Sequence, residues 1–390
     1  MLLWLLHRWT LIWPGCFFCD ELAALGKITF RASLAALTGF VLAVLLGPRW
    51  IGWLKCHFRE PIKSDSPEVR RLHRDKESTP TMGGLFIVAG LLAGVVLFGD
   101  LDNCYLQISL LVAGGLALIG AIDDLVKLRG TTNGISARSK LVGQVAVATV
   151  AAVLLYQYHV GLPEGLQLRL PAAGISFSLG LWFIPLAVIV IVGASNAVNL
   201  TDGLDGLAGG CLIFATGAMT VMAYAAGHAG LAEYLHVPRI PGAGEMTVLA
   251  GGMIGGVLGF LWFNCHPAQV FMGDTGALPL GGLLGLLAVV TRQEVLLVVV
   301  GGVFVAEAVS VILQVGCYKW RRRRVFLCAP LHHHFQFQGW AENKIVVRFW
   351  IAAALCALLG VAGLKLTVQE NAPRPSVQAS AADRTHQQKP

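Results

Sequence analysis

The chain has 390 residues, of which 56% are hydrophobic and 13% are charged, and its mean hydropathy is +0.68. Soluble domains carry roughly 25% charged residues, so this composition excludes a disordered chain, a secreted disulfide scaffold and an ordinary soluble enzyme. It predicts an integral membrane protein. The net charge of +7 does not indicate nucleic-acid binding, because the Lys and Arg residues gather at the ends of apolar stretches. Anionic lipid or phosphate would meet them there.

The chain contains about ten apolar stretches that suit membrane-spanning helices, provided that the shorter ones extend into neighbouring polar residues. They cover residues 30–54, 82–98, 106–122, 141–159, 178–198, 206–226, 247–263, 277–290, 296–316 and 346–366. We therefore expect an all-α integral membrane protein with about ten transmembrane helices, built from residues 30–366. Residues 1–29 are expected to be an external or interfacial segment, and the polar residues 367–390 a disordered tail.

The distribution of Lys and Arg predicts the orientation of the chain in the membrane. The loops fall into two alternating sets, of which one holds 17 basic residues and the other, which includes both termini, holds 8. The richer set consists of residues 55–81, 123–140, 195–205, 264–276 and 317–345. We expect this set to be cytoplasmic and both termini to lie outside. In the outer set, the alternating runs LQLRL and GISFS, in and just after residues 160–176, favour a small external β-hairpin.

Acidic residues are scarce, and several of them lie in the basic loops. Asp123 and Asp124 end the third apolar stretch, and two adjacent carboxylates repel each other unless a cation or a shared proton intervenes. A solvated helix end is the alternative, although a helix C-terminus favours Lys or Arg. Asp274 lies in a Gly-Asp-x-Gly turn between two stretches. Its carboxylate suits a hard cation such as Mg²⁺, and a plain Asx-turn is the alternative.

The segment SNAVNLTDGLDGLAGG, residues 195–210, is a polar insert between two apolar runs. If it is helical up to Asp205, Asn199, Asp202 and Asp205 share one face. Asn199 or Thr201 could instead cap the next helix. A glycine follows each aspartate, which indicates that backbone approaches a ligand closely.

The first basic loop contains Lys76, which is either a phosphate contact or an interfacial cation. Thr79-Pro80-Thr81 and the glycines after it indicate a helix start or an anion-cradling turn.

The last basic loop carries four arginines, residues 321–324, and three histidines, His332, His333 and His334. We interpret the arginines as a positive-inside anchor. Consecutive side chains on a helix point about 100° apart, so the histidines cannot all bind one metal. Hydrogen bonding to a phosphate or a sugar is favoured. Together, the five loops indicate metal-assisted transfer or hydrolysis of a phosphoryl group on an anionic substrate beside lipid.

These motifs resemble the phospho-N-acetylmuramoyl-pentapeptide-transferase family, in the superfamily of polyprenyl-phosphate N-acetylhexosamine-1-phosphate transferases. The resemblance covers roughly residues 29–366 and rests on NAVNLTDGLDGL, FMGDTG, the Asp123-Asp124 pair and APLHHHF, with connecting phrases such as TPTMGG and PAQVFMGD. It implies ten transmembrane helices in the bacterial inner membrane, a cytoplasmic active site, Mg²⁺ and a homodimer. The implied reaction moves phospho-N-acetylmuramoyl-pentapeptide from UDP to undecaprenyl phosphate, giving lipid I and UMP for peptidoglycan synthesis.

The resemblance also implies roles for individual residues. Asp123 and Asp124 match the family's catalytic aspartate pair, and Asp274 matches its Mg²⁺-binding aspartate. We expect Asp124 to assist Asp274 at the Mg²⁺, and His332, which matches a further active-site position, to be catalytic as well. The matching substrate-binding positions are Lys76, Thr81, Lys127, Asn199, Asp202, Asp205, Asn264, His333 and His334. Ala277 stands where the family usually has Ser, which puts in doubt any contact made by that hydroxyl.

Two questions stay open in the sequence. The acceptor phosphate could attack directly after Asp123 takes its proton, or an aspartate could form an acyl-phosphate first. A sister transferase that uses UDP-N-acetylhexosamine is the nearest alternative function. A transporter or lipid flippase is the other, for which Glu307 is the clearest intramembrane acid.

Overall fold

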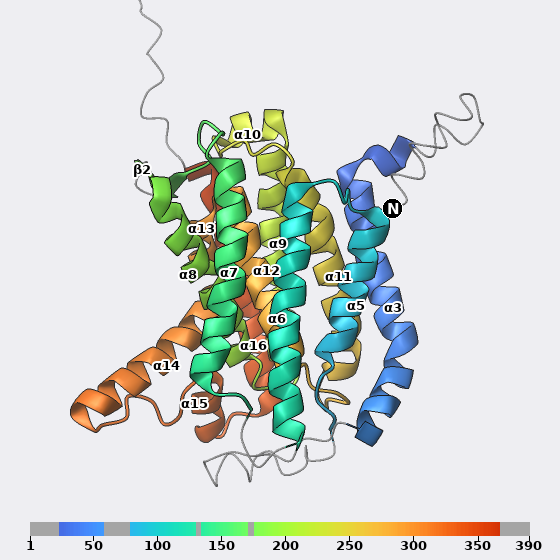
Figure 1. Cartoon of the computed structure of the whole chain (residues 1–390). Coiled ribbons are helices and arrows are strands. Elements are labelled where there is room, and N and C mark those ends of the chain that lie inside the picture. Colours follow the sequence, from blue (N-terminus) through green and yellow to red (C-terminus); the bar gives the residue numbers. More distant parts are fainter. Residues whose placement is uncertain (1–22, 58–78, 130–133, 171–174, 367–390) are drawn as a thin grey trace, which may run out of the picture.

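The computed structural model describes residues 23–57, 79–129, 134–170 and 175–366 of the chain. Ten apolar helices form one bundle in this part of the chain (Figure 1). They are α3 (Ile28–His57), α5 (Gly84–Phe98), α6 (Cys104–Arg129), α7 (Ala137–His159), α8 (Phe183–Thr201), α9 (Leu207–Gly227), α11 (Met246–Asn264), α12 (Asp274–Thr291), α14 (Gly302–Arg321) and α16 (Glu342–Gly363). Nine are long and apolar enough to cross a membrane, and α5 is a shorter apolar helix of 15 residues. The predicted all-α, multi-pass membrane fold is confirmed.

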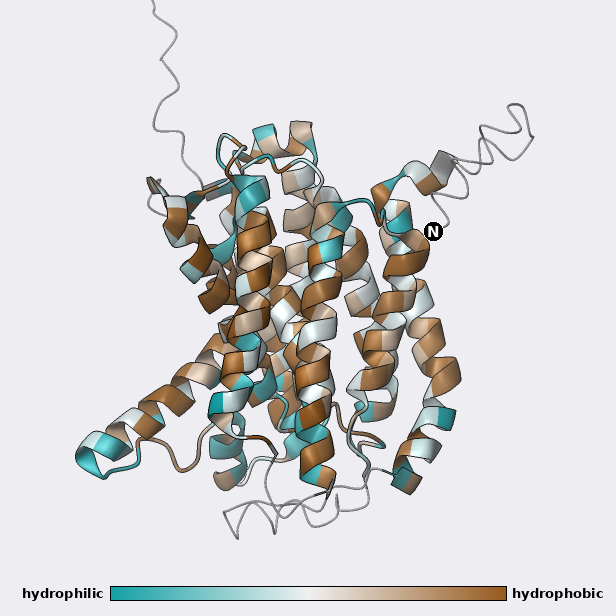
Figure 2. Cartoon of the chain, in the orientation of Figure 1, coloured by the Kyte–Doolittle hydropathy of each residue, from teal (hydrophilic) through white to brown (hydrophobic). Residues whose placement is uncertain are grey.

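Helix α12 forms the centre of the bundle. All of its residues are buried, because it is apolar around its whole circumference and packs against α6 and α8. Small residues allow this close packing: a Cβ on Gly281 would lie 2.6 Å from the carbonyl oxygen of Ala194 in α8. Hydrophobic residues dominate the middle of the bundle, and hydrophilic residues gather at its two ends (Figure 2).

Short elements connect or flank these helices. They are the helices α10 (Ala229–Leu235), α13 (Glu294–Val300) and α15 (Leu331–Phe337), the 3₁₀ turns η1 (Ala23–Gly26), η4 (Gly180–Trp182), η5 (Ala243–Glu245) and η6 (Leu364–Leu366), and two strands. Strands β1 (Gln167–Leu170) and β2 (Ile175–Ser178) pair antiparallel, with Gln167 opposite Ser178. The predicted hairpin is therefore confirmed. The buried Arg292 fastens it to the bundle by donating to the carbonyl oxygen of Gln167.

Both ends of the described chain lie at the hairpin end of the bundle. Arg31 in α3 forms a buried ion pair with Glu245 of η5, and Lys365 in η6 donates to the hydroxyl of Tyr234 in α10. The basic loops that follow α6 and α14 lie at the opposite end (Figure 1). We call it the site end, because the candidate active site described below lies there. Most of the predicted outer segment 1–29 and all of the tail 367–390 fall outside the described residues.

The expected continuous span over residues 296–316 is wrong. The chain forms α13, breaks at Gly301 and starts again as α14, because two adjacent glycines lack the side chains that support a helix interior. After the break, α14 leaves the bundle at an angle as a separate arm (Figure 1). Only 22% of its apolar window is buried.

Candidate active site

Asp123 and Asp124 lie inside a helix and not at its solvated end. Helix α6 continues to Arg129, and the two aspartates are only 3% and 0% exposed, so the solvated-end alternative is wrong. Asp124 accepts hydrogen bonds from the backbone N–H of Asp274 at 3.2 Å and from the N–H and hydroxyl of Thr275 at 2.9 and 2.7 Å. It therefore satisfies N–H groups at the start of α12 that have no partner within the helix.

The expected Gly-Asp-x-Gly turn around Asp274 is wrong, because α12 already begins at Asp274. Only the glycine before it has a turn conformation. Gly273 has φ +70° and ψ 174°, a conformation open in practice only to glycine. A Cβ at this position would lie 2.7 Å from Oδ2 of Asp124 and 3.0 Å from the hydroxyl of Thr81. The glycine therefore lets the start of α12 approach both α6 and the buried Thr81.

The three aspartates form what we call the carboxylate cluster: Asp123, Asp124 and Asp274, whose ligand atoms lie within 4.8 Å of one another. Lys127 Nζ lies 2.8, 3.3 and 3.2 Å from carboxylate oxygens of Asp123, Asp124 and Asp274, respectively. Lys140 also pairs with Asp274 and lies 3.6 Å from Asp123. Three carboxylates facing two ammonium groups leave net negative charge, and an all-oxygen donor set suits Mg²⁺.

Residues 199–205 do not form one helix, so the shared face of Asn199, Asp202 and Asp205 that a helix would give is wrong. Helix α8 ends at Thr201, so Asn199 and Asp205 do not share a face. Asn199 donates to Oδ1 of Asp274 at 2.8 Å and thus belongs to the carboxylate cluster. Neither Asn199 nor Thr201 caps α9, whose N-cap is Gly206 with φ +77°.

Asp202 follows α8 directly and faces the same negative charge. Burial, and then the carboxylates of Asp274, Asp124 and Asp205, raise the pKa of Asp202 to about 7. Its protonation state thus changes near neutral pH, where an uncharged Asp202 can donate a hydrogen bond to an anion.

Asp205 belongs to a second group of side chains. Its carboxylate accepts from His266 Nδ1 at 3.0 Å and from the N–H of Ala268 at 3.1 Å. The N–H of Asp205 itself donates to Glu342 at the start of α16. Asn264 accepts from the N–H of Gly206 at 2.9 Å. These bonds fasten the loop before α9 to the end of α11, to the loop before α12 and to the start of α16.

The segment before α5 starts a helix, as predicted, but does not cradle an anion with its glycines. The N–H groups of Gly83 and Gly84 donate to the carbonyl oxygens of Phe271 and Met272, both at 2.8 Å. Those N–H groups are therefore already bonded to the loop that leads to Asp274, and they are not available to an anion. Lys76 lies outside the described residues.

The three histidines of α15 have different partners. His332 is 1% exposed and lies against Glu307 of α14, which accepts from the His332 backbone N–H at 3.2 Å and faces its Nδ1 at 3.2 Å. His332 Nε2 is buried without a partner in the described part of the chain. His333 Nδ1 lies 2.8 Å from Gln336, and His334 Nδ1 accepts from the N–H of Leu327.

Sequence reasoning missed several residues that complete this arrangement. From the sequence, Lys140 is only one of the basic loop residues, whereas the structure places it one turn into α7. Glu307 is, from the sequence, only an intramembrane acid. Thr275, His266 and Glu342 gave no signal, because their partners lie more than sixty residues away in the chain.

Comparison with known proteins assigns the family. Residues 106–292 match the model of glycosyl transferase family 4, and residues 76–88 match phospho-N-acetylmuramoyl-pentapeptide-transferase signature 1. A relative from Solidesulfovibrio magneticus is 48% identical over 347 residues, and one from Maridesulfovibrio salexigens is 46% identical over 345 residues. Each match covers 87% of this chain and 94% of the relative, and both relatives are named phospho-N-acetylmuramoyl-pentapeptide-transferase.

Proposed function

Because this chain belongs to the phospho-N-acetylmuramoyl-pentapeptide-transferase family, we propose that it carries out the reaction in that name. It transfers phospho-N-acetylmuramoyl-pentapeptide from a UDP carrier to undecaprenyl phosphate, giving lipid I and UMP in the first membrane step of peptidoglycan synthesis. The observation that carries this proposal is the carboxylate cluster with Lys127 and Lys140, which joins α6, α7 and α12 at one end of a membrane bundle. The related transfer of N-acetylhexosamine phosphate is not favoured.

The carboxylate cluster is the proposed Mg²⁺ site, with Asp274 and Asp124 as the ligands. Three buried carboxylates drawn together within 4.8 Å repel one another, and this donor set fits a hard divalent cation. When bound, Mg²⁺ neutralises charge on the diphosphate and polarises its phosphoryl oxygens.

In the direct scheme that we propose, Asp123 takes the remaining proton from the acceptor phosphate. An oxygen of that phosphate then bonds to the phosphorus next to the sugar. The bond from this phosphorus to the bridging oxygen breaks, and UMP leaves with that oxygen. Lys127 and Lys140 stabilise the charge that develops on the phosphoryl oxygens, and Asn199 holds Asp274 in place. Asp202, Asp205, Asn264, Thr81, Lys76 and the three histidines are the proposed contacts to the nucleotide and sugar.

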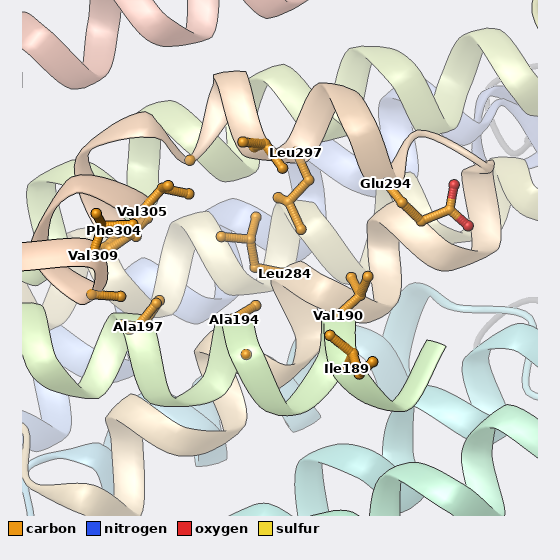
Figure 3. Close-up of a pocket in the computed structure, with 15 residues that line it drawn as sticks. Ile189, Val190, Ala194, Ala197, Leu284, Glu294, Leu297, Phe304, Val305 and Val309 are labelled. Carbon is orange, nitrogen blue, oxygen red and sulfur yellow. The ribbon is translucent and has the colours of Figure 1, made fainter. Parts of the chain in front are cut away.

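An apolar cavity of about 270 Å³ is the proposed place for the polyprenyl chain. It lies between α8, α12, α13 and α14 (Figure 3), and side chains such as Ile189, Val190 and Val309 line it. Ile189 is 68% exposed, so the rim of the cavity faces the surroundings of the bundle. A lipid tail can therefore enter sideways from the bilayer without passing through water.

The proposal also covers the location of the protein and its orientation in the membrane. We place the protein in the bacterial inner membrane with the site end facing the cytoplasm, because the basic loops lie at that end. A homodimer is the oligomeric state that the family resemblance implies.

Release of UMP by detergent-purified protein tests the function. Muramoyl-pentapeptide and N-acetylhexosamine donors are supplied in parallel, each with polyprenyl phosphate. We expect release with the first donor only, and release only with the second would overturn the proposal. Asp274→Asn should abolish release at ordinary Mg²⁺, and full activity would remove Asp274 from the metal site. A phosphorylated enzyme trapped with donor alone would refute direct attack.

A cavity-filling pair of variants tests the acceptor site. A side chain on Gly193 has open space and lies in the cavity, whereas one on Gly217 in α9 has open space elsewhere. Gly193→Leu should raise the KM for polyprenyl phosphate several-fold and leave the KM for the UDP donor unchanged. Gly217→Leu is the matched control. Equal acceptor KM values in the two variants would refute the assignment of the cavity.

A further inference from the structure

The tip of the α14 arm carries an uncompensated block of positive charge, which we call the arginine turn, residues 319–324. It consists of Lys319, Trp320 and four arginines, and all six side chains are exposed. The sequence contains no acidic residue between Glu307 and Glu342. In the described part of the chain, no carboxylate pairs with these five cations. Arg321 stacks over the ring of Trp320 at 4.6 Å, which leaves its charge unneutralised. A strongly basic surface without internal carboxylate partners favours an anionic partner from outside.

The arginine turn has a defined conformation. Helix α14 ends where Arg322 adopts φ +54°, and the N–H of Arg322 donates to the carbonyl oxygen of Tyr318. The chain then runs back along the arm, where the N–H groups of Val325 and Phe326 donate to Oε1 of Gln314 at 2.9 and 3.0 Å. Gln314 in turn donates to the carbonyl oxygen of Phe326 at 3.0 Å. The four arginines are thus held together at the tip and are not part of a loose loop.

The sides of the arm match a lipid environment. Ile312 is 68% exposed and lies on the shaft of the arm, while the aromatic residues Tyr318 and Trp320 are exposed just before the arginines. Apolar shaft, aromatic residues and cations follow one another in the order of bilayer core, interface and headgroups. Clusters of four to eight basic residues at the cytoplasmic end of a spanning helix attract anionic lipids.

The arm also connects the tip to the site. Val305 and Val309 of α14 line the apolar cavity. Glu307 of the same helix accepts from the backbone N–H groups of Leu331 and His332 at 2.6 and 3.2 Å. A change in the angle of α14 therefore moves a wall of the cavity and the support of His332 together.

We propose that the arginine turn binds the headgroups of anionic phospholipids in the leaflet at the site end, and that this binding holds α14 at the angle that keeps the cavity open. The four guanidinium groups supply bidentate donors for phosphodiester oxygens. Binding of phospholipid stands on the charge and geometry of the tip alone. Its consequence for the acceptor rests on the proposed function.

Lipid retention by the full chain tests the binding. The protein, purified in mild detergent without substrates, is mixed with phosphatidylglycerol and phosphatidylcholine of the same acyl chains, and retained lipid is counted by native mass spectrometry. We expect wild-type protein to prefer phosphatidylglycerol at least tenfold. A variant with Arg321–Arg324 changed to Gln should lose most of that preference. The control Arg49→Gln with Arg138→Gln removes charge from other helices at the same end and should keep it.

Two results would overturn the binding: equal retention of both lipids by wild-type protein, or an unchanged preference in the arginine variant. A parallel sample that also contains polyprenyl phosphate separates the two lipids. If the arginine variant lost polyprenyl phosphate but kept its preference for phosphatidylglycerol, the proposal would also be overturned, because the tip would then bind the acceptor and not bulk lipid. These outcomes do not depend on whether the protein is a transferase.

The effect of bound phospholipid on the acceptor site is measured as the KM for polyprenyl phosphate in nanodiscs. We expect a several-fold lower KM for polyprenyl phosphate in phosphatidylglycerol than in phosphatidylcholine, with the KM for the UDP donor unchanged. The arginine variant should show no such difference between the two lipids. An acceptor KM that stays constant in wild-type protein, while phosphatidylglycerol still binds, would refute the effect on the cavity.

Discussion

Gly120 in α6 sets the distance between the two halves of the carboxylate cluster. It lies one turn before Asp123 and Asp124, at the point where α6 crosses the start of α12. A Cβ at this position would lie 2.3 Å from the carbonyl oxygen of Asp274 and 2.7 Å from the N–H nitrogen of Thr275. An ordinary contact begins near 3.4 Å. In Gly120→Ala, the two helices must therefore separate by about 1 Å, because backbone cannot rotate away as a flexible side chain can.

This separation moves Asp123 and Asp124 away from Asp274 and stretches the bonds of Asp124 to Thr275. A misplacement of about 1 Å in a catalytic site can lower a rate about 100-fold. We expect kcat for UMP release to fall by that order in Gly120→Ala, with a higher Mg²⁺ concentration needed for half-maximal activity. The cost in stability should be about 1–3 kcal/mol, as for an overpacked core. The KM for donor should change less than kcat.

The same helix offers a matched control. A Cβ on Gly114 of α6 meets nothing within 4 Å, so Gly114→Ala makes the same chemical change where there is room. It should keep full activity and gain about 0.4–1 kcal/mol from the reduced flexibility of the unfolded chain. If folded Gly120→Ala turned over like Gly114→Ala, the close packing of α6 on α12 would not set the geometry of the site.

Three further perturbations test other parts of the structure. Glu307→Gln weakens the hold on His332, so kcat for UMP release should fall about tenfold, in keeping with a lost charged hydrogen bond; an unchanged kcat would contradict this role. Asp202 has its pKa raised to about 7, which favours the folded state at low pH. The melting temperature of metal-free protein should therefore fall as the pH rises from 5 and level off above about pH 7, whereas Asp202→Asn should show a shallower slope. Arg31→Met leaves Glu245 buried without a counter-ion, with only the N–H of Asp100 donating to it among the described residues. We therefore expect a loss of about 3–5 kcal/mol in folding stability, and a smaller loss when Glu245→Leu is added. Thermal melts in detergent measure the stability of the single and the double variant. A double variant that is less stable than Arg31→Met would contradict the ion-pair argument.

The sequence by itself was sufficient for the features that depend on local pattern. Apolar length predicts the spans, since each must satisfy its own backbone hydrogen bonds in lipid. The alternation of LQLRL and GISFS predicts the hairpin because side chains of a strand point to opposite faces in turn. The motifs around Asp123, Asp202 and Asp274 also pointed to the family, which the relatives confirm.

Only the tertiary structure decided how those residues group. Asp124 and Asp274 are 150 positions apart, and their contact depends on glycines that let two helices touch. The aspartates of residues 195–210 looked like one face, yet Asp202 faces the carboxylate cluster while Asp205 bonds to His266, because α8 stops at Thr201. Lys140 joined the site through the packing of α7. Periodicity describes one segment at a time, whereas a charged group finds its partner through close packing between segments, which no single stretch of sequence encodes.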